Sequence, residues 1–500
     1  MAELTPMMRQ YLQMKQAHPD CILFFRLGDF YEMFLEDAKL VSKELDLTLT
    51  TRDRGKAKED QTPMCGVPYH SADAYIARLI NKGYKVAICE QMEDPATAKG
   101  LVDRDIIRII TPGTIINEAM LEEGRNNFLC AVYTDGAGGA VCFCDLSTGE
   151  VWATSFPPQG LSEHLYNELG RFSPREAVLS DLAYQDEDVR ACPRERRDGR
   201  CGAGGEGRIG LEEARRTVEQ QFRAGLEGLP AGDDHALRAV GGLLTYLYET
   251  QKTDLGHVST LNYYTSGQFM ELDYNARRNL ELTETMRSKE KKGSLLWVLD
   301  KTKTAMGHRL IRSWLERPLL SPVQINKRLG AVADLVGDAI AREEIALVLR
   351  EITDLERLIG RIVYGTAGGR DLAALAAGLG RVPDVRRRLE SFPSTLLSHL
   401  RTELDDLEDL RDLIGRAIVD DPPFSVREGG FIRPGYSQEV DHYRDILQNG
   451  KGVVASIEAA EKERTGIKGL KVGYNKVFGY YIEVSKSYLS QVPDTYIRKQ

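Results

Sequence analysis

The chain has 500 residues, of which 42% are hydrophobic and 28% are charged, which is the length and composition of a globular protein with several domains. Its formal charge of -9 argues against a uniformly basic nucleic-acid coat, although an average charge can conceal a local basic patch. No apolar run reaches membrane-spanning length, no basic and apolar leader follows Met1, and the eight cysteines form no paired CxxC set, so we expect a cytoplasmic protein with reduced thiols and no zinc site.

The first clear strand is Cys21–Phe25, an unbroken apolar run that is followed by Gly28. A helix is predicted to follow, with Asp29 as its N-cap and Glu32 three residues later, as in a capping box. Apolar residues then recur at helical spacing, at Phe34, Ala38, Val41 and Leu45. On this local pattern alone, Phe30 is interpreted as a core residue and Glu32 as part of the cap.

The rest of the first segment alternates between helix and strand signals. A helix is expected around residues 75–80, and strands are expected at Lys85–Cys89 and Ile106–Ile110, which predicts a mixed sheet covered by helices. Arg104 and Arg108 lie near the end of this segment. They are interpreted either as surface charges beside a strand or as contacts to phosphates.

A second α/β pattern begins near residue 117. Strands are predicted at Phe128–Thr134 and Gly139–Asp145, joined as a hairpin. The segment 190–208 is rich in Arg and Gly and is interpreted as a solvated loop in preference to a nucleic-acid-binding patch. Asp145 could pass for the first carboxylate of a metal nuclease, but no second and third acidic residues accompany it.

Beyond Thr250 the sequence changes to long helical patterns, whose Leu and Trp residues are expected to be core. Pro and Gly residues between 422 and 435 interrupt them, a helix is predicted at Ser437–Arg464, and β-type composition follows at Leu470–Val484. The segment 462–486 contains six basic and two acidic residues, a local excess of four positive charges. The basic residues are Lys462, Arg464, Lys468, Lys471, Lys476 and Lys486, and the acidic ones are Glu463 and Glu483. A charged, exposed hairpin is the alternative to a DNA-binding one.

Six stretches carry a resemblance to a known family: GDFYEMF followed by EDA, TPMCGVPYH at 62–70, AICEQMEDPATAKG at 87–100, RIITPGT at 108–114, DYNARRNLEL at 273–282 and KVGYNKVFGYYIEVSK at 471–486. In sequence and in order they resemble segments of the MutS family of DNA mismatch-repair proteins. The resemblance covers essentially the whole chain.

The resemblance implies a multidomain fold that is α/β in its first part and all-α beyond. The implied parts are a mixed-sheet α/β mismatch-binding domain at 1–115, an α/β connector domain at 116–250, a long-helix core or lever domain at 251–432, a β-rich DNA clamp insertion at 433–494, and the start of a return helix at 495–500.

The resemblance also implies the function, which is recognition of mispaired or unpaired bases in DNA mismatch repair. Phe30 and Glu32 match the family's F-x-E motif, so Phe30 is expected to wedge into the duplex and kink it, with Glu32 as the discriminator. The family's clamp grips the DNA backbone, which favours phosphate contacts for the clamp lysines. The expected DNA-binding residues are Arg104, Arg108, Lys468, Lys471 and Lys476.

Several expectations concern the whole family protein. No G-x-x-x-x-G-K-[ST] motif occurs in these 500 residues, so no catalytic residue is assigned here, and ATP and Mg²⁺ are expected to bind a domain that follows residue 500. The expected partners are mismatched double-stranded DNA, small insertion or deletion loops, a second copy of the chain and a MutL-type protein, without a membrane, in the bacterial cytoplasm at the nucleoid. The alternatives are a metal-dependent, structure-selective DNA nuclease using Asp29 and Glu32, and a helical scaffold with no role on DNA.

Overall fold

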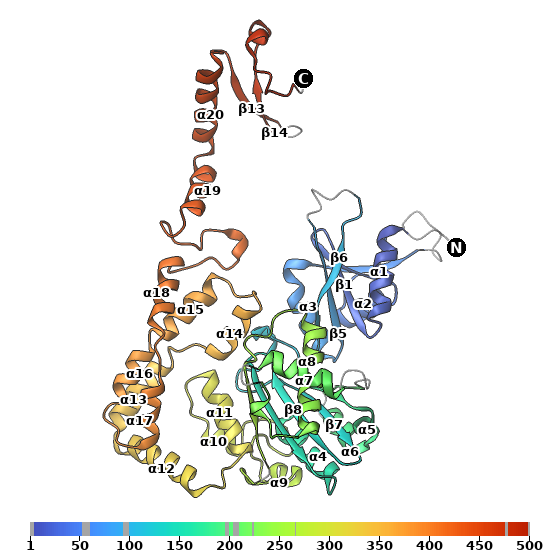
Figure 1. Ribbon diagram of the computed structural model, residues 1–500, viewed down its shortest axis with the longest axis vertical. Helices are drawn as coiled ribbons and strands as arrows, with labels where there is room; N and C mark the ends of the chain where they lie inside the picture. The colour runs from blue at the N-terminus through green and yellow to red at the C-terminus, as the bar shows by residue number, and fades with distance from the viewer. Residues whose placement is uncertain are drawn as a thin grey trace. The chain divides into compact units, whose positions relative to one another are not determined.

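The computed structural model describes residues 5–52, 61–93, 100–195, 200–203, 210–222, 225–265, 267–475 and 479–498. The chain, traced in Figure 1, divides into two compact units. The larger unit comprises Met1–Ala367 and Ala377–Glu408, and the smaller comprises Gly368–Ala376 and Asp409–Gln500. Within the described part of the chain, no helix combines the length and the apolar character needed to cross a membrane.

A six-stranded mixed sheet organises the first α/β domain, which is blue in Figure 1. The strands in sheet order are β3 (Thr50–Thr51), β4 (Pro63–Pro68), β2 (Phe30–Phe34), β1 (Cys21–Leu27), β5 (Lys85–Gln91) and β6 (Arg104–Ile110). β1 pairs parallel with β5, and the other neighbouring pairs are antiparallel. The predicted mixed sheet and its strands near 85–89 and 106–110 are therefore confirmed.

Helices cover both faces of this sheet: α1 (Pro6–Ala17) on one face, α2 (Leu35–Leu45) and α3 (Ala72–Asn81) on the other. The two faces follow from the alternation of side chains along a strand. On β1, Ile22 and Phe24 point into the core under α2 and α3, whereas Leu23 and Phe25 point into the core under α1. Both cores are closed by buried apolar side chains.

The helix predicted from Asp29 is wrong over its first turn, because Phe30–Phe34 is strand β2 and α2 begins only at Leu35. β2 is paired on both sides, with β1 and with β4, so its backbone groups find partners in the sheet. Pairing with β4, about thirty residues later, outweighs the local cap signal. Neither Asp29 nor Glu32 caps the helix, whose N-cap position is Phe34.

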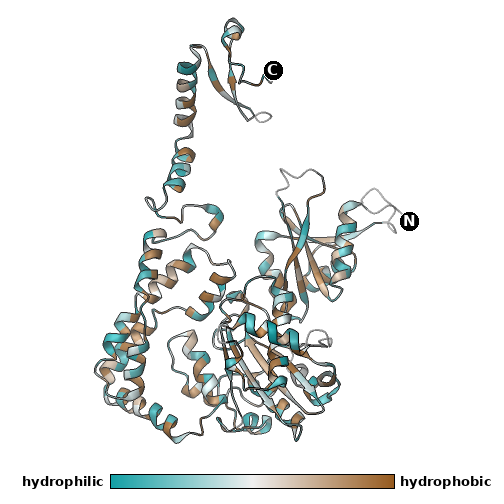
Figure 2. Ribbon diagram, in the orientation of Figure 1, coloured by the Kyte–Doolittle hydropathy of each residue, from teal (hydrophilic) through white to brown (hydrophobic). Residues whose placement is uncertain are grey.

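A second six-stranded sheet organises a second α/β domain, which we call the connector domain. Its strands follow in the order β11 (Arg200–Ala203), β10 (Glu176–Leu179), β7 (Phe128–Asp135), β8 (Gly138–Asp145), β9 (Glu150–Phe156) and β12 (Thr260–Tyr263). It packs with α4 (Leu161–Phe172), α5 (Asp181–Gln185), α6 (Glu187–Glu195), α7 (Leu211–Gln221) and α8 (Asp234–Gln251). Hydrophobic residues concentrate on the strands, as Figure 2 shows, and they are buried in two clusters. The predicted hairpin is confirmed, since Asp135 pairs with Gly138.

The segment 190–208 differs from the predicted loop at two places. Residues 190–195 belong to helix α6, and residues 200–203 form β11, which pairs parallel with β10. Composition missed this strand because its pairing partner lies outside the segment. Residues 196–199 and 204–209 lie outside the described residues.

The helical part of the larger unit contains α9 (Tyr274–Asn279), α10 (Leu295–Leu299), α11 (Ala305–Glu316), α12 (Pro322–Gly337), α13 (Ala339–Leu349), α14 (Leu355–Val363), α16 (Val382–Arg388) and α17 (Thr395–Glu403). The prediction that its apolar residues are core is wrong for several of them. Leu296 is buried on α10, whereas Trp297, Leu310 and Trp314 are exposed. Helical spacing predicts which residues share a face, but not what covers that face.

Two buried arginines anchor these helices to the segment between the two sheets. Arg309 on α11 makes a two-pronged ion pair with Asp354, with both N–O distances 2.7 Å. Arg357 on α14 donates to the carbonyls of Glu122 and Arg125, each at 2.9 Å. Such charge-assisted bonds hold polar groups in a buried position where unpaired charges would be costly.

The smaller unit carries most of α15 (Gly369–Leu379), nearly all of α18 (Glu408–Ala417), then α19 (Gln438–Gln448), α20 (Gly450–Thr465) and a hairpin of β13 (Lys471–Asn475) and β14 (Gly479–Glu483). The predicted β region is confirmed, and the helix predicted at Ser437–Arg464 is found as two helices separated at Asn449. A 3₁₀ helix follows at Lys486–Gln491. The predicted return helix at 495–500 is not found as far as Arg498, because residues 494–496 form a turn.

Candidate nucleic-acid interface

The hairpin of β1 and β2 turns through two residues, Gly28 and Asp29, because Leu27 pairs with Phe30. Gly28 has a φ of 58°, a left-handed conformation that glycine adopts without strain. Asp29 accepts a backbone hydrogen bond from Tyr69 at 3.0 Å, which ties the turn to the end of β4. Phe30 therefore lies at the turn end of a strand that is paired on both sides.

Alternation along β2 separates its side chains into two sets. Tyr31 and Met33 enter the core under α2 and α3, so Phe30, Glu32 and Phe34 share the opposite face. Phe34 is buried against Tyr11 of α1, with ring centroids 5.0 Å apart. Phe30 lies at the other end of β2 from Phe34 and is 46% exposed. The interpretation of Phe30 as a core residue is therefore wrong.

Gly66 on β4 leaves space beside these side chains. It pairs with Glu32 across the strands, and a Cβ atom there would lie 3.5 Å from Cγ of Glu32 and 3.8 Å from Cδ1 of Phe30. Both are ordinary van der Waals distances, and the closest atom would be the carbonyl oxygen of Tyr31, at 3.3 Å. We call the surface formed by Phe30, Glu32 and Gly66 the hairpin face.

Glu32 is a half-buried carboxylate that lacks a hydrogen bond on one oxygen. Its Oε2 atom is buried and finds no hydrogen-bond partner among the described residues, and Nη1 of Arg52 lies 3.8 Å from it. Burial raises the pKa of Glu32, and the charge of Arg52 opposes that rise. The cap interpretation of Glu32 is wrong, since the residue lies in a strand.

A polar network on the other face supports the hairpin, and the sequence analysis missed it. The Arg26 guanidinium lies over the Tyr69 ring, 3.5 Å from its centroid, and donates to the Gly28 carbonyl. Arg26 also forms an ion pair with Glu90, and Glu90 accepts a hydrogen bond from the Tyr31 hydroxyl. The tyrosine in the GVPYH stretch and the glutamate in AICEQ were the only signals in the sequence.

Arg104 is an internal anchor, which corrects the interpretation as a solvated charge. It is buried and donates to the carbonyls of Arg26 and Val102, each at 2.8 Å. Its guanidinium carbon lies 5.1 Å from the centre of the Phe25 ring, and burial lowers its pKa. Its hydrogen bonds therefore go to the protein, and the structure lends no support to a phosphate contact.

Arg108 is likewise used inside the larger unit. It donates to the side chain of Gln251 on α8 at 3.0 Å and to the carbonyl of Thr114 at 3.1 Å. Burial lowers the pKa of its guanidinium, which lies 5.5 Å from the centre of the Tyr364 ring. Arg108 thus joins the first sheet to the connector domain and to α14's end.

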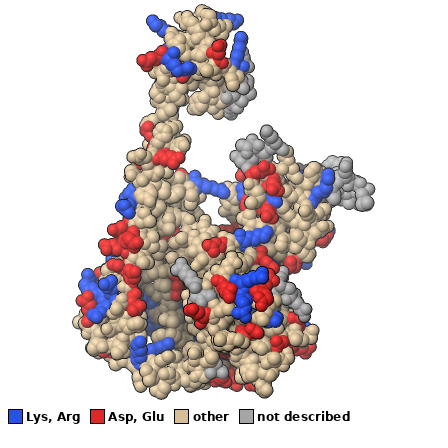
Figure 3. Space-filling model, viewed as in Figure 1, with Lys and Arg blue, Asp and Glu red and all other residues tan. Residues whose placement is uncertain are grey.

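The basic residues of the smaller unit divide into paired and exposed ones. Lys462 and Arg464 form ion pairs with Glu458 and Glu461 of the same helix, at 2.6 Å and 2.7 Å. Lys468, Lys471 and Lys486 are exposed, and Figure 3 shows basic as well as acidic side chains on this unit. Lys476 lies outside the described residues.

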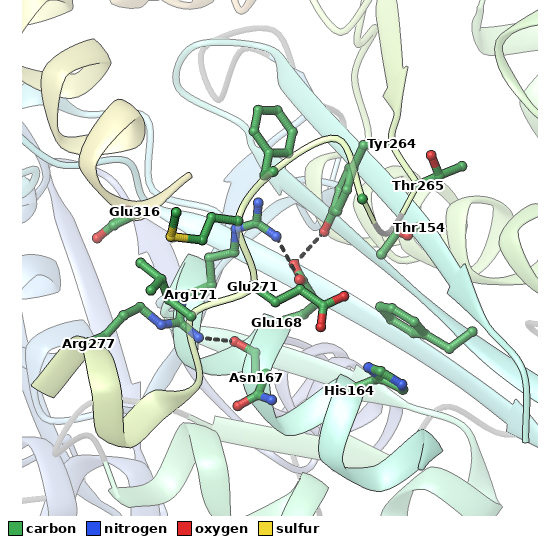
Figure 4. A pocket seen from close by; sticks show the side chains of 15 residues that line it. Thr154, His164, Asn167, Glu168, Arg171, Tyr264, Thr265, Glu271, Arg277 and Glu316 are labelled. Atoms are coloured by element: carbon green, nitrogen blue, oxygen red, sulfur yellow. Dashed lines mark hydrogen bonds and ion pairs between the residues drawn. The ribbon is translucent and has the colours of Figure 1, made fainter. Parts of the chain in front are cut away.

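A cavity of about 50 Å³ in the connector domain is the other polar recess of interest. Glu168 holds its centre, since it accepts from Arg171 at 2.7 Å and from the Tyr264 hydroxyl at 2.5 Å (Figure 4). Arg277 donates to the Asn167 carbonyl on the same wall. These bonds fix α4 to neighbouring segments and present no nucleophile paired with a base.

The nuclease alternative has no site in the part of the chain that the structure describes. There, no group of three His, Cys, Asp or Glu residues is placed to hold a metal ion. Asp145 is buried and accepts from the backbone of Asn127 and from the hydroxyl of Ser147. Its carboxylate closes the end of β8 and holds the following turn.

Comparison with known families identifies matches along almost the whole chain. Four family models match: MutS domain I at residues 5–119, MutS domain II at 127–259, MutS domain III at 275–467, and MutS family domain IV at 435–500. The first covers the sheet that carries the hairpin face. The fourth covers the hairpin of β13 and β14.

Several bacterial proteins named DNA mismatch repair protein MutS align over the whole chain. Those of Acetivibrio thermocellus and Ruminiclostridium cellulolyticum are 48% and 46% identical over 500 residues. That of Symbiobacterium thermophilum is 49% identical over 508 aligned positions. In each case the alignment takes in 100% of this chain and 57% of the relative. With four family domains matched in order, the chain belongs to the MutS family.

Proposed function

We propose that the chain recognises mispaired or unpaired bases in double-stranded DNA through its hairpin face. The observation that carries this proposal is the position of Phe30. Its ring is 46% exposed at the end of a strand whose other residues are at least half buried. An aromatic ring held outward on a rigid strand is suited to enter a base stack.

Mismatches have no common sequence, so hydrogen bonding to base edges cannot identify them as a class. They share weak pairing and stacking. Inserting an aromatic side chain between bases costs a few kcal/mol per step, and the cost is lower where pairing is already broken. Phe30 would therefore insert more readily at a mismatch than at a paired step, and its insertion would kink the duplex.

Glu32 is proposed as the discriminating group beside the wedge. A carboxylate facing a polyanion is unfavourable unless it accepts a hydrogen bond. A displaced base can offer a donor to Oε2, which accepts no hydrogen bond from the described residues, whereas a paired base does not. The carboxylate would therefore penalise matched DNA more than mismatched DNA.

The clamp lysines are proposed to supply affinity that does not depend on sequence. Lys468 and Lys471 are exposed on the smaller unit and can approach phosphates, and Lys476 stays a candidate on the sequence resemblance. Arg104 and Arg108 are not included, because their guanidinium groups bind protein carbonyls.

The test is a competition between mismatched and matched duplexes for the Phe30→Ala variant. Preference for the mismatch should disappear while weak binding to matched DNA persists, because phosphate contacts supply the latter. Leu49→Ala is the matched control, since Leu49 is also 46% exposed in the same domain. Retained preference in folded Phe30→Ala protein would overturn the proposal.

Properties of the whole family protein are proposals of a different kind, because the chain spans 57% of the length of these relatives. They are dimerisation, binding of ATP with Mg²⁺ and contact with a MutL-type partner. None of them is assigned to a residue of this chain.

A further inference from the structure

Arg52 is the charged group that the structure places against the Glu32 carboxylate. It follows β3, and its side chain reaches across β4 until Nη1 lies 3.8 Å from Oε2 of Glu32. This distance is too long for a hydrogen bond but short enough for a substantial attraction between opposite charges. The Arg52 side chain is 50% exposed and that of Glu32 is 20% exposed, so the pair sits at the boundary with solvent.

The other elements packed around Glu32 offer no equivalent partner among the described residues. Its neighbours across the strands are Phe25 and Gly66, which carry no charge. Arg104 lies on the same face beside Phe25, but its donors are taken by backbone carbonyls.

The remaining charges near this domain's centre are engaged elsewhere. Arg26 lies on the opposite face and pairs with Glu90. On α1, Lys15 and the Tyr11 hydroxyl both bond to Asp37. The electrostatic balance at Glu32 is therefore between its own burial and the charge of Arg52.

We propose that Arg52 is a positioning residue for mismatch discrimination, which favours the charged form of Glu32 and leaves its Oε2 atom open to a donor from a displaced base. The inference rests on the proposed function of the hairpin face. A cation at hydrogen-bond distance would occupy the oxygen, whereas without a cation burial would act unopposed in favour of the protonated form. The long ion pair avoids both effects: it opposes protonation and leaves the oxygen without a hydrogen bond.

The consequence is a pH dependence of discrimination. When Glu32 is protonated it no longer repels matched DNA, so the ratio of mismatch to match affinity should fall as the pH is lowered through the pKa of Glu32. Removing the Arg52 charge leaves burial unopposed and raises that pKa further. The fall in the ratio should therefore occur at higher pH in Arg52→Gln.

The experiment measures the affinity ratio from pH 5 to 8 at constant ionic strength for the wild-type chain, Arg52→Gln, Arg52→Lys and Glu32→Gln. A ratio is used because any phosphate contact of Arg52 affects both duplexes and cancels. The expected result is a midpoint at higher pH for Arg52→Gln, a midpoint near wild type for Arg52→Lys, and a low, flat ratio for Glu32→Gln.

The outcomes separate the two proposals. A wild-type chain that shows no mismatch preference at any pH removes the proposed function. A clear wild-type preference with the same midpoint in Arg52→Gln overturns the role of Arg52 alone. A pH dependence that persists unchanged in Glu32→Gln also overturns it, because another group would then be titrating.

Discussion

Burial and charge oppose each other within the Glu32 side chain. The residue is half buried on a strand, and desolvation raises its pKa, whereas Arg52 acts in the opposite direction. Since the folded protein binds a proton on Glu32 more readily than the unfolded chain, this residue favours the native state at low pH. That contribution is complete below the unfolded pKa of about 4.3 and is lost as the pH rises through the folded pKa.

Glu32→Gln should therefore be more thermally stable than the wild type at neutral pH, with a difference that shrinks as the pH falls towards 4. The same variant should bind matched DNA more tightly, by roughly five-fold for about 1 kcal/mol of relieved repulsion, and gain little on mismatches. Melting curves across pH and duplex competition measure the two effects. Equal losses on both duplexes would contradict the discriminator role.

At the scale of elements, the turn Thr111–Thr114 joins the first sheet to the connector domain. Glu176 on β10 is buried and accepts from the Thr111 hydroxyl, from the Gly113 backbone at 3.1 Å and from the Tyr246 hydroxyl at 2.7 Å. Gly113 is needed for this approach, because a Cβ there would lie 2.9 Å from Cβ of Glu176. The RIITPGT stretch is thus explained as a joint between domains.

Gly113→Ala should destabilise the chain by about 1–3 kcal/mol, as overpacking of a filled site does. Gly136→Ala is the control, because Gly136 has nothing within 4 Å of the added Cβ. Thermal unfolding measures the stability of both variants, and hydrogen exchange measures the protection of the turn at residues 111–114. Similar behaviour of the two would mean that Glu176 moves aside without cost.

At the scale of the whole molecule, net charge is a poor guide to function. The chain carries a formal charge of -9, yet Lys468 and Lys471 are exposed on the smaller unit, and neither forms an ion pair with another described residue. Attraction to phosphates depends on such local charges, because charges more than about 10 Å away are largely screened at 0.1 M salt. Binding of all duplexes should therefore respond to these lysines.

Replacing Lys468 and Lys471 together by Gln should weaken binding to matched and mismatched duplexes alike. The slope of log affinity against log salt should fall by up to about two units if each lysine contacts a phosphate. Lys39→Gln with Lys289→Gln is the control, since both residues are exposed and the charge change is the same. An unchanged slope would return Lys468 and Lys471 to the solvated-hairpin interpretation.

The sequence by itself determined the features that depend on neighbouring residues. Apolar runs and alternation predicted β1, β5, the hairpin of β7 and β8, and the strands around 471–483, because strand faces are set by a period of two. Six stretches predicted the family, which the comparisons confirm. One of these stretches also predicted the site residues Phe30 and Glu32, because it contains the family's F-x-E motif.

Only the tertiary structure decided the features that depend on distant segments. Phe30 lies on a strand and not on a helix because β4 pairs with β2, and no local pattern contains that partner. Arg104 and Arg108 are internal because carbonyls and amides 78 and 143 residues away along the chain reach them. Burial of a charge depends on which segments meet in space, so local sequence patterns left open what folding decided for these arginines.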